Sequence, residues 1–297
     1  MIGQDWRGQP LQTTPRYLCT TEGQNPNQII DRRNKDAFEI ERPSTIADAV
    51  TALKGEDAQA LGGGQTLIPT LKQRLAAPEV LVSLGAIGEM KGVCVGDDGA
   101  VCIGGATTHA TVAQKAAAHY PALAHMASHI GDPAVRNRGT IGGSLANNDP
   151  SACYPAGVLA SGATVMTDRR AIAADDYFQG MFTTALDEGE IITEVRFPVP
   201  QTANYQKFVQ PASRFALVGV FVAKYPDGVR VAVTGASENG VFRWSEAEAA
   251  LAADFSVDAI AELHVPADDM ISDLHGSAAY RAHLVNVMTG RAISAMS

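Results

Sequence analysis

The pattern of hydrophobic and polar positions predicts short strands alternating with helices up to about residue 200, and mostly strands after it. In the first part, apolar residues recur either at helical spacing or in short extended runs. The ordered part is expected to begin at 38–43. The predicted elements after it are a helix from Ser44 as N-cap to 53, a strand in 58–61, a helix in 67–76, a strand in 80–84 and a hairpin of 92–95 with 100–104. Residues 58–84 therefore form a predicted strand–glycine loop–helix–strand unit.

Helices dominate the middle of the chain, and strands return near its end. Thr107 or Thr108 is the predicted cap of an alanine-rich helix that ends near Tyr120. The other predicted elements are helices in 121–130 (ended by Gly131-Asp132-Pro133) and 154–160, strands in 205–209, 217–225, 229–234 and 241–244, a helix opened by a Ser245–Glu248 capping box, and a last helix from Ser277 to about 296. The change from alternating strands and helices to mostly strands predicts a domain boundary near residues 198–201.

Two glycine clusters each follow or precede an apolar stretch, and both are predicted to be loops. The first is Gly62-Gly63-Gly64-Gln65-Thr66 and the second is Gly139-Thr140-Ile141-Gly142-Gly143-Ser144. Glycines expose backbone N–H groups, which bind anions where a loop opens onto a helix. Two such loops predict one ligand with two adjacent negative groups, such as the pyrophosphate of a nucleotide cofactor.

Charge and composition narrow the class of protein. The 297 residues carry a net charge of −9, which argues against a nucleic-acid binder. No apolar run reaches the roughly 18 residues of a membrane span. Residues 1–36 predict a disordered extension without a secretory signal, so the expected location is the cytoplasm. The four cysteines, Cys19, Cys94, Cys102 and Cys153, form no C-x-x-C pair, and no metal site is expected.

Several further segments stand in the order and spacing of one family. They are Phe38-x-x-x-Arg42-Pro43, Gly62 to Pro69, Arg74-Leu75-Ala76, Gly139 to Ser144, Asp149-Pro150, Gly189-Glu190-Ile191, Phe197-Pro198 and Ser277-Ala278-x-Tyr280-Arg281. Together they resemble the medium, FAD-binding subunit of molybdenum hydroxylases. That family includes the carbon monoxide dehydrogenase medium subunit and the flavin domain of xanthine dehydrogenase. The resemblance covers residues 38–297.

The resemblance implies an α+β fold with FAD bound between its parts. A two-subdomain FAD-binding domain of the PCMH type would cover 37–199, and a smaller α/β domain with an antiparallel sheet would cover 200–297. The FAD pyrophosphate would lie between the two glycine segments. The implied pyrophosphate-binding residues are Gly62, Gly63, Gly64, Gln65, Thr66, Thr140, Ile141, Gly142, Gly143 and Ser144.

The resemblance also implies contacts at the ring and ribityl end of the flavin. Phe215 would stack on the ring, with burial in the core as the alternative. Lys207 would place positive charge near the ring or else be solvated at the surface, and Ile192 would pack on the ring or be buried in a strand. Asn148 and Asp149 would reach polar atoms of the flavin or else form a turn. Cys153 stands where the family commonly has an acidic residue, and a thiol is a weaker acceptor.

The function implied is electron transfer, and no catalytic residue is expected in this chain. His109 is interpreted as a local hydrogen-bonding residue. Expected partners are a large subunit with the molybdenum–pterin cofactor and a small subunit with [2Fe–2S] clusters, as a dimer of heterotrimers. An autonomous flavin oxidoreductase and a flavin-free assembly subunit are the alternatives. The substrate and the terminal electron acceptor stay open.

Overall fold

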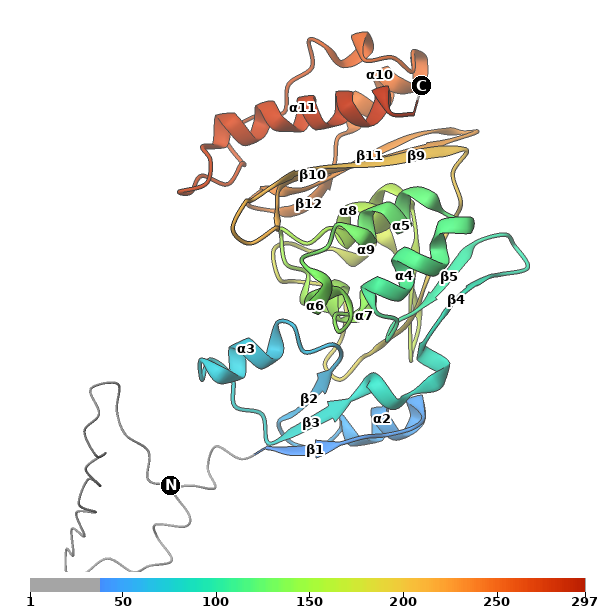
Figure 1. Cartoon of the computed structure of the whole chain (residues 1–297), viewed down its shortest axis with the longest axis vertical. Coiled ribbons are helices and arrows are strands. Elements are labelled where there is room, and N and C mark those ends of the chain that lie inside the picture. The colour runs from blue at the N-terminus through green and yellow to red at the C-terminus, as the bar shows by residue number, and fades with distance from the viewer. Residues whose placement is uncertain (1–37, 297) are drawn as a thin grey trace, which may run out of the picture. The chain divides into compact units, whose positions relative to one another are not determined.

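The computed structural model describes residues 38–296 of the chain. The extension expected in 1–36 lies outside these residues, as does Cys19. The part that begins at Phe38 forms one compact unit built on three sheets of three, five and four strands (Figure 1). No helix in the described part of the chain is long and apolar enough to cross a membrane.

The first sheet is small and parallel, and it has its own core. Its strand order is β1 (Glu39–Glu41), β3 (Val80–Ser83) and β2 (Ala58–Leu61). Helix α2 (Ile46–Ala52) buries Ala49 in that core, and its N-cap is Thr45. Ser44 was the wrong cap, because it is the Thr45 hydroxyl that accepts the amide hydrogen bond of Asp48.

After β2, helix α3 (Leu67–Lys72) ends four residues earlier than the sequence predicted. Its C-cap is Gln73, and the following Arg74 has a φ of 59°, a left-handed conformation that cannot continue a helix. Two 3-10 turns, η1 (Leu84–Ala86) and η2 (Gly88–Met90), then lead into the second sheet.

The second sheet is antiparallel and has helices packed on it. Its strand order is β4 (Val93–Val95), β5 (Val101–Gly104), β8 (Ile192–Phe197), β6 (Thr164–Thr167) and β7 (Ala171–Ala173). The β4–β5 hairpin was predicted from the sequence, whereas β6 and β7 were not. The helical elements of this part are α4 (His109–Lys115), η3 (Ala116–Ala118), α5 (Pro121–Ser128), α6 (Pro133–Arg136), α7 (Ile141–Asn147), α8 (Tyr154–Ala160) and α9 (Ala174–Tyr177).

The third sheet is the predicted antiparallel meander. Its strand order is β12 (Gly240–Arg243), β11 (Gly228–Ser237), β10 (Ala216–Tyr225) and β9 (Thr202–Val209). Helix α11 (Ala278–Ser294) lies on one face and α5 and α8 on the other (Figure 1). The remaining helical elements are α10 (Ser245–Ala253) and η4 (Asp258–Ile260).

The capping box predicted at Ser245–Glu248 does not form. Ser245 is the first residue of α10, and the cap position is Trp244. The Glu248 carboxylate instead accepts hydrogen bonds from the Val231 amide and from the guanidinium of Arg243. It therefore ties α10 to β11 and β12.

The main hydrophobic core continues across the predicted domain boundary at 199/200. Tyr120, from the helical part, packs edge-on against Phe197 and Phe221. The distances between ring centroids are 6.4 Å and 6.1 Å. Phe197 precedes the boundary and Phe221 follows it, and both side chains are fully buried. The division into 37–199 and 200–297 stays a prediction, although the two segments share one core.

Candidate functional site

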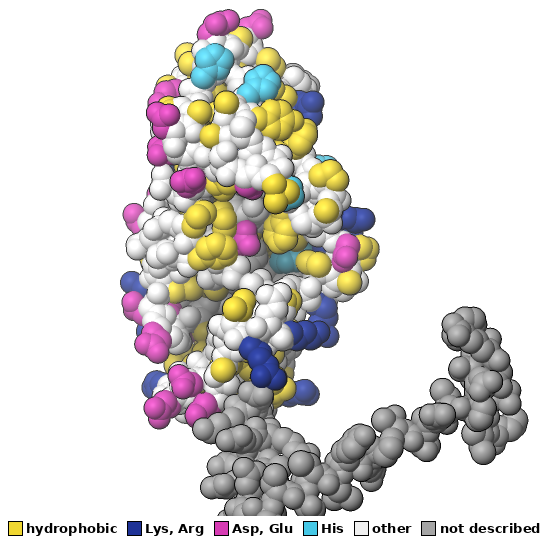
Figure 2. Space-filling model, turned by 90° about the vertical axis from the view of Figure 1, so that its left-hand side faces the viewer, with side chains coloured by type: hydrophobic (Ala, Val, Ile, Leu, Met, Phe, Trp, Pro, Cys, Tyr) yellow, Lys and Arg dark blue, Asp and Glu magenta, His cyan; other side chains and the backbone are white. Residues whose placement is uncertain are grey.

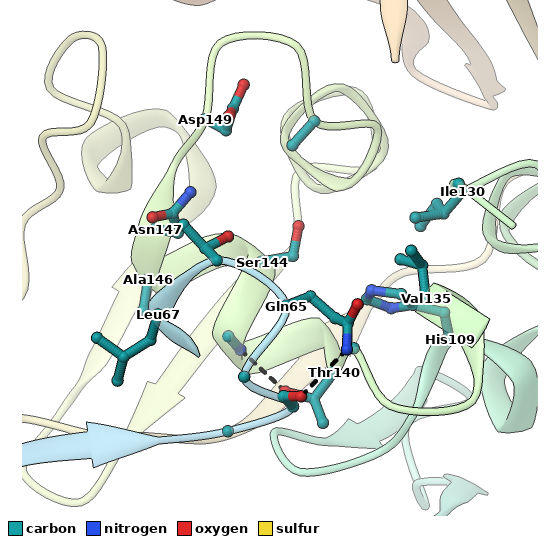
Figure 3. A pocket seen from close by; sticks show the side chains of 18 of the residues that line it. Gln65, Leu67, His109, Ile130, Val135, Thr140, Ser144, Ala146, Asn147 and Asp149 are labelled. Atoms are coloured by element: carbon teal, nitrogen blue, oxygen red, sulfur yellow. Dashed lines mark hydrogen bonds between the residues drawn. The ribbon is translucent and has the colours of Figure 1, made fainter. Parts of the chain in front are cut away.

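A cavity of about 620 Å³ lies where the two glycine segments meet. This volume is typical of a small-molecule or cofactor site. Its wall is formed by the β2–α3 loop, α7, the start of α8, the end of β9 and the 211–215 loop. In the view of Figure 3, Gln65 and Thr140 lie at one end of this wall and Asp149 at the other.

The two glycine segments are in direct contact, although about 75 residues separate them in the sequence. A Cβ built on Gly63 would lie 2.0 Å from the carbonyl oxygen of Arg138. A Cβ on Gly62 would lie 3.0 Å from Oγ1 of Thr140. Only glycine permits this approach at residue 63, and the contact creates one continuous wall from two distant segments.

The first glycine segment leaves its backbone donors available. None of the amides from Gly62 to Thr66 donates a hydrogen bond to another described residue. Gly64 has a φ of 71°, a conformation that glycine adopts without strain. The Gln65 amide group donates to the carbonyl of Gly63 at 3.5 Å, and its side chain lines the cavity (Figure 3). This loop matches the donor set that a phosphate group needs.

The second glycine segment is the first turn of helix α7, where the sequence predicted a loop. Thr140 is its N-cap, and its Oγ1 accepts from the amide of Gly143 at 3.2 Å. The amides of Ile141 and Gly142 donate to the carbonyls of Thr107 and Gly105, at 3.1 Å and 2.9 Å.

The expected role of Ile141 and Gly142 as phosphate donors is therefore corrected. Both are buried, and both lie outside the cavity wall. The hydroxyls of Thr140 and Ser144 remain as donors that line the cavity from this side.

Two further expected cofactor contacts also lie elsewhere. Asn148 is buried at the C-cap of α7, and its amide group donates to the carbonyls of Gly180 and Thr183, both at 2.8 Å. Ile192 is buried in β8 and belongs to the main core, as the alternative interpretation held. Neither side chain lines the cavity. Asn148 is hydrogen-bonded to the 180–183 loop, and Ile192 is packed in the core.

The other expected residues at the ring end do line the cavity. Phe215 is 46 % exposed on the wall, so its alternative as a core residue is wrong. The ammonium group of Lys207 donates to the carbonyl of His129 at 3.0 Å and to Sγ of Cys153 at 3.5 Å. It is thus held in place and not merely solvated. Cys153 is 4 % exposed, at the start of α8.

Asp149 forms the predicted turn and also lies on the cavity wall. Its carboxylate accepts from the amide of Ser151 at 2.8 Å, as in a turn stabilised by an Asp side chain. It also lines the cavity, where burial raises the pKa of its carboxyl group. A hydrogen-bond donor on a ligand would find an acceptor at this position.

His109 is a wall residue that was not among the expected ligands. Its ring is 4 % exposed, and its centroid lies 5.3 Å from that of the Tyr154 ring. Nδ1 has no hydrogen-bond partner among the described residues. Burial, followed by the charge of Arg136, lowers the pKa of His109 to about 4, so the ring is neutral at pH 7. Gly139 packs against this ring, since a Cβ there would lie 2.5 Å from Nε2. No neighbour in the sequence indicates this contact, because Gly139 lies thirty positions later in the chain.

Comparison with known proteins shows which proteins the chain is similar to. Residues 36–200 match the family described as the FAD binding domain in molybdopterin dehydrogenase. The chain is 36 % identical to the carbon monoxide dehydrogenase medium chain of Afipia carboxidovorans, over 86 % of this chain and 96 % of that protein. It is 37 % identical to the nicotine 6-hydroxylase medium subunit of Paenarthrobacter nicotinovorans, with the same coverage.

Solved structures agree with the sequence relatives. A chain of reconstituted carbon monoxide dehydrogenase from Oligotropha carboxidovorans superposes with a TM-score of 0.78 at 33 % identity, covering 88 % of this chain and 99 % of that one. A chain of quinoline 2-oxidoreductase from Pseudomonas putida 86 gives a TM-score of 0.79 at 27 % identity, with coverage of 88 % and 96 %.

Proposed function

Because the chain belongs to the family of FAD-binding domains of molybdopterin dehydrogenases, we propose that it is the electron-transfer subunit of a multi-subunit molybdenum hydroxylase. It takes electrons from a [2Fe–2S] subunit and passes them to an external acceptor. The observation that carries this proposal is the contact of the two glycine segments at one cavity, with unused amides from Gly62 to Thr66 on its wall.

The residues on the wall fit FAD by their chemistry. The backbone of Gly62 to Thr66 and the hydroxyls of Thr140 and Ser144 would hold the pyrophosphate. Phe215 would cover a flat ring, and Lys207 would supply positive charge near it. Bound FAD supplies the ability to exchange electrons one or two at a time.

The chain's own contribution is binding, orientation and exclusion of water. Helix α8 and strand β9 fix Cys153 and Lys207 against each other. Burial keeps the ring of His109 neutral, and this gives no support to a role as acid at pH 7. No observation favours an autonomous oxidoreductase with its own substrate site.

The proposal extends to the rest of the complex. Hydroxylation of the substrate takes place in a large partner with the molybdenum–pterin cofactor, and the complex is a dimer of heterotrimers in the cytoplasm. Within the chain, 37–199 forms the FAD-binding domain and 200–297 a second domain. The medium-chain relatives support the existence of partners.

The visible absorption spectrum of the full chain, alone and co-purified with its partners, tests the proposal. We expect flavin bands, together with molybdenum and iron in the co-purified complex. Absence of flavin in every preparation would contradict FAD binding and favour an assembly subunit. Reduction of the bound flavin by a small organic substrate with the chain alone would favour an autonomous enzyme.

A further inference from the structure

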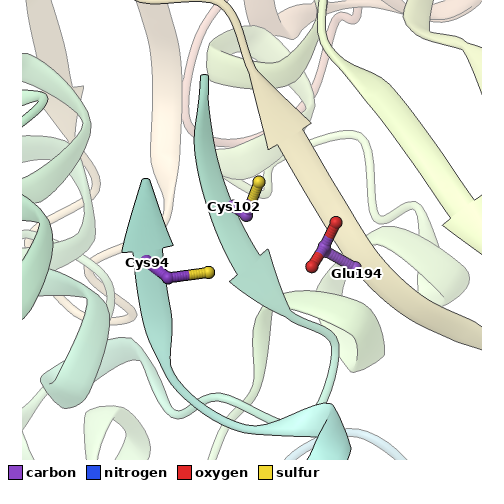
Figure 4. Close-up of side chains that lie close together, drawn as sticks. All are labelled: Cys94, Cys102 and Glu194. Atoms are coloured by element: carbon purple, nitrogen blue, oxygen red, sulfur yellow. The ribbon is translucent and has the colours of Figure 1, made fainter. Parts of the chain in front are cut away.

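Two cysteines and a glutamate come together on the second sheet, away from the cavity wall. Cys94 on β4 and Cys102 on β5 lie directly opposite each other in the register of the hairpin. Glu194 on the neighbouring strand β8 joins them, and the two sulfur atoms and a carboxylate oxygen all lie within 4.8 Å of one another. Figure 4 shows the three side chains gathered over adjacent strands.

The cluster lies on the face of the sheet that does not build the main core. The alternate residues Val101, Ile103 and Val195 are fully buried in that core. Because side chains alternate between faces along a strand, the cluster lies on the other face. Cys102 is 3 % exposed there, whereas Cys94 is exposed. Cys102 is thus enclosed, while Cys94 leaves access from solvent.

Arg196 holds the carboxylate of Glu194 in position. It lies opposite Cys102 in the β5–β8 register, and its Nε donates to Oε1 of Glu194 at 3.0 Å. Only Oε1 is used by this contact. Carboxylates that ligate metals are themselves commonly hydrogen-bonded in this way.

We propose that Cys94, Cys102 and Glu194 bind one divalent thiophilic cation, for which Zn²⁺ is the best match. Zinc prefers four-coordinate sites of sulfur, nitrogen and oxygen, with Zn–S bonds of about 2.3 Å. Ligand atoms in a tetrahedral site with such bonds lie roughly 3.8 Å apart, a separation compatible with the cluster. Water occupies the fourth position.

The charges of the site balance when the cation is bound. Two thiolates and one carboxylate carry three negative charges, and the divalent ion with the guanidinium of Arg196 carries three positive ones. Each thiol binds the ion as a thiolate and must lose its proton to do so. Affinity for the ion therefore falls as the pH is lowered.

This site departs from the expectation that the chain holds no metal. That expectation rested on the absence of a C-x-x-C pair. The two cysteines here meet through a hairpin register, and the third ligand comes from a strand about ninety residues later in the sequence.

Cobalt binding to the full chain tests the proposal, with Co²⁺ as the probe. The chain is reduced with a phosphine, freed of metal and checked for four titratable thiols, then titrated with Co²⁺. We expect one Co²⁺ per chain, with thiolate-to-cobalt charge-transfer bands that Zn²⁺ displaces. Absence of these bands from the fully reduced wild-type chain would overturn the proposal.

Substitutions assign the bands to the cluster. In Cys94→Ser and Cys102→Ser the charge-transfer bands should be lost, and in Glu194→Gln the affinity for Co²⁺ should fall at least tenfold. The matched controls Cys153→Ser and Cys19→Ser should bind as the wild type does. Bands that persist in Cys94→Ser, or that disappear in Cys19→Ser, would contradict the assigned ligands. FAD content does not enter this readout, so the test is independent of the proposed function.

Discussion

Replacing Gly63 by alanine should separate the two glycine segments and remove FAD. The added Cβ would lie 2.0 Å from the carbonyl oxygen of Arg138 and 2.6 Å from Cα of Gly139. Both are backbone atoms, so the segments must move apart by roughly 1 Å before the shorter contact reaches 3.0 Å. Overpacking of this kind costs about 1–3 kcal/mol of folding free energy. For a domain of this size, that lowers the Tm by roughly 2–4 °C per kcal/mol.

The effect on FAD affinity should be larger than the effect on stability. A hydrogen bond to a charged group contributes about 1.5–3 kcal/mol, so displacement of two amides from the pyrophosphate costs at least about 3 kcal/mol. This corresponds to a Kd about 100-fold higher. Titration of the FAD-free full chain, followed by quenching of FAD fluorescence, measures the Kd directly.

The matched control for this experiment is Gly88→Ala. A Cβ on Gly88 would meet no atom of the described residues within 4 Å, and Gly88 does not line the cavity. We expect its Tm and its Kd for FAD to equal those of the wild type. A Kd for Gly63→Ala within twofold of the wild type, or an equal loss in Gly88→Ala, would refute the reasoning.

Three further predictions concern buried residues near the site and behind it. The pKa of His109 is about 4, below the 6.5 of an unfolded chain, so the unfolding free energy should fall by roughly 3 kcal/mol between pH 6.5 and 4. In urea unfolding, His109→Gln should lose less stability over this pH range than the wild type. An equal loss in both proteins would argue against a buried neutral ring. Arg170 lowers the pKa of Glu190 to about 2, so Glu190 contributes stability that is complete above pH 4.5 and lost as the pH falls towards 2. Glu190→Gln should therefore cost about 2 kcal/mol at pH 7 and only a small part of that at pH 2, where about half of the folded molecules carry a protonated Glu190; an undiminished difference at pH 2 would contradict this. Gly142→Ala should lower the Tm, because its Cβ would lie 2.7 Å from the Gly105 carbonyl oxygen; a wild-type Tm would mean that α7 can shift.

Much of the fold followed from local signals in the sequence. The strand 58–61, the helix 154–160 and the β10–β11 turn at Pro226–Gly228 depend on hydrophobic runs and turn residues that act within a few positions. Strands β6 and β7 were missed because each is only three or four residues long, and because β6 also depends on pairing with β8, about thirty residues later in the chain. The capping box at Ser245 failed for a similar reason, since Glu248 serves a tertiary contact.

The candidate site was predictable where the chemistry resides in motifs. The first glycine segment, Thr140 and Phe215 were predicted from the sequence as site residues, and all of them line the cavity. Their contact with FAD stays a prediction. The error at Gly142 arose because glycine has two uses. It can free an amide for a ligand or permit close packing, and only the position of Gly105 decides between them.

The hydrogen bonds of Thr234 link the two halves of the chain, and this matters for expressing either half as a fragment. The Thr234 hydroxyl donates to the carbonyls of Pro150 and Ala152, both at 2.8 Å, and the amide of Gly235 donates to Pro150 as well. A recombinant fragment ending at residue 200 would retain the whole family match but lose these anchors, together with Lys207 and Phe215. We therefore expect that preparing the protein with FAD bound requires both halves of the chain, expressed as one polypeptide or supplied together.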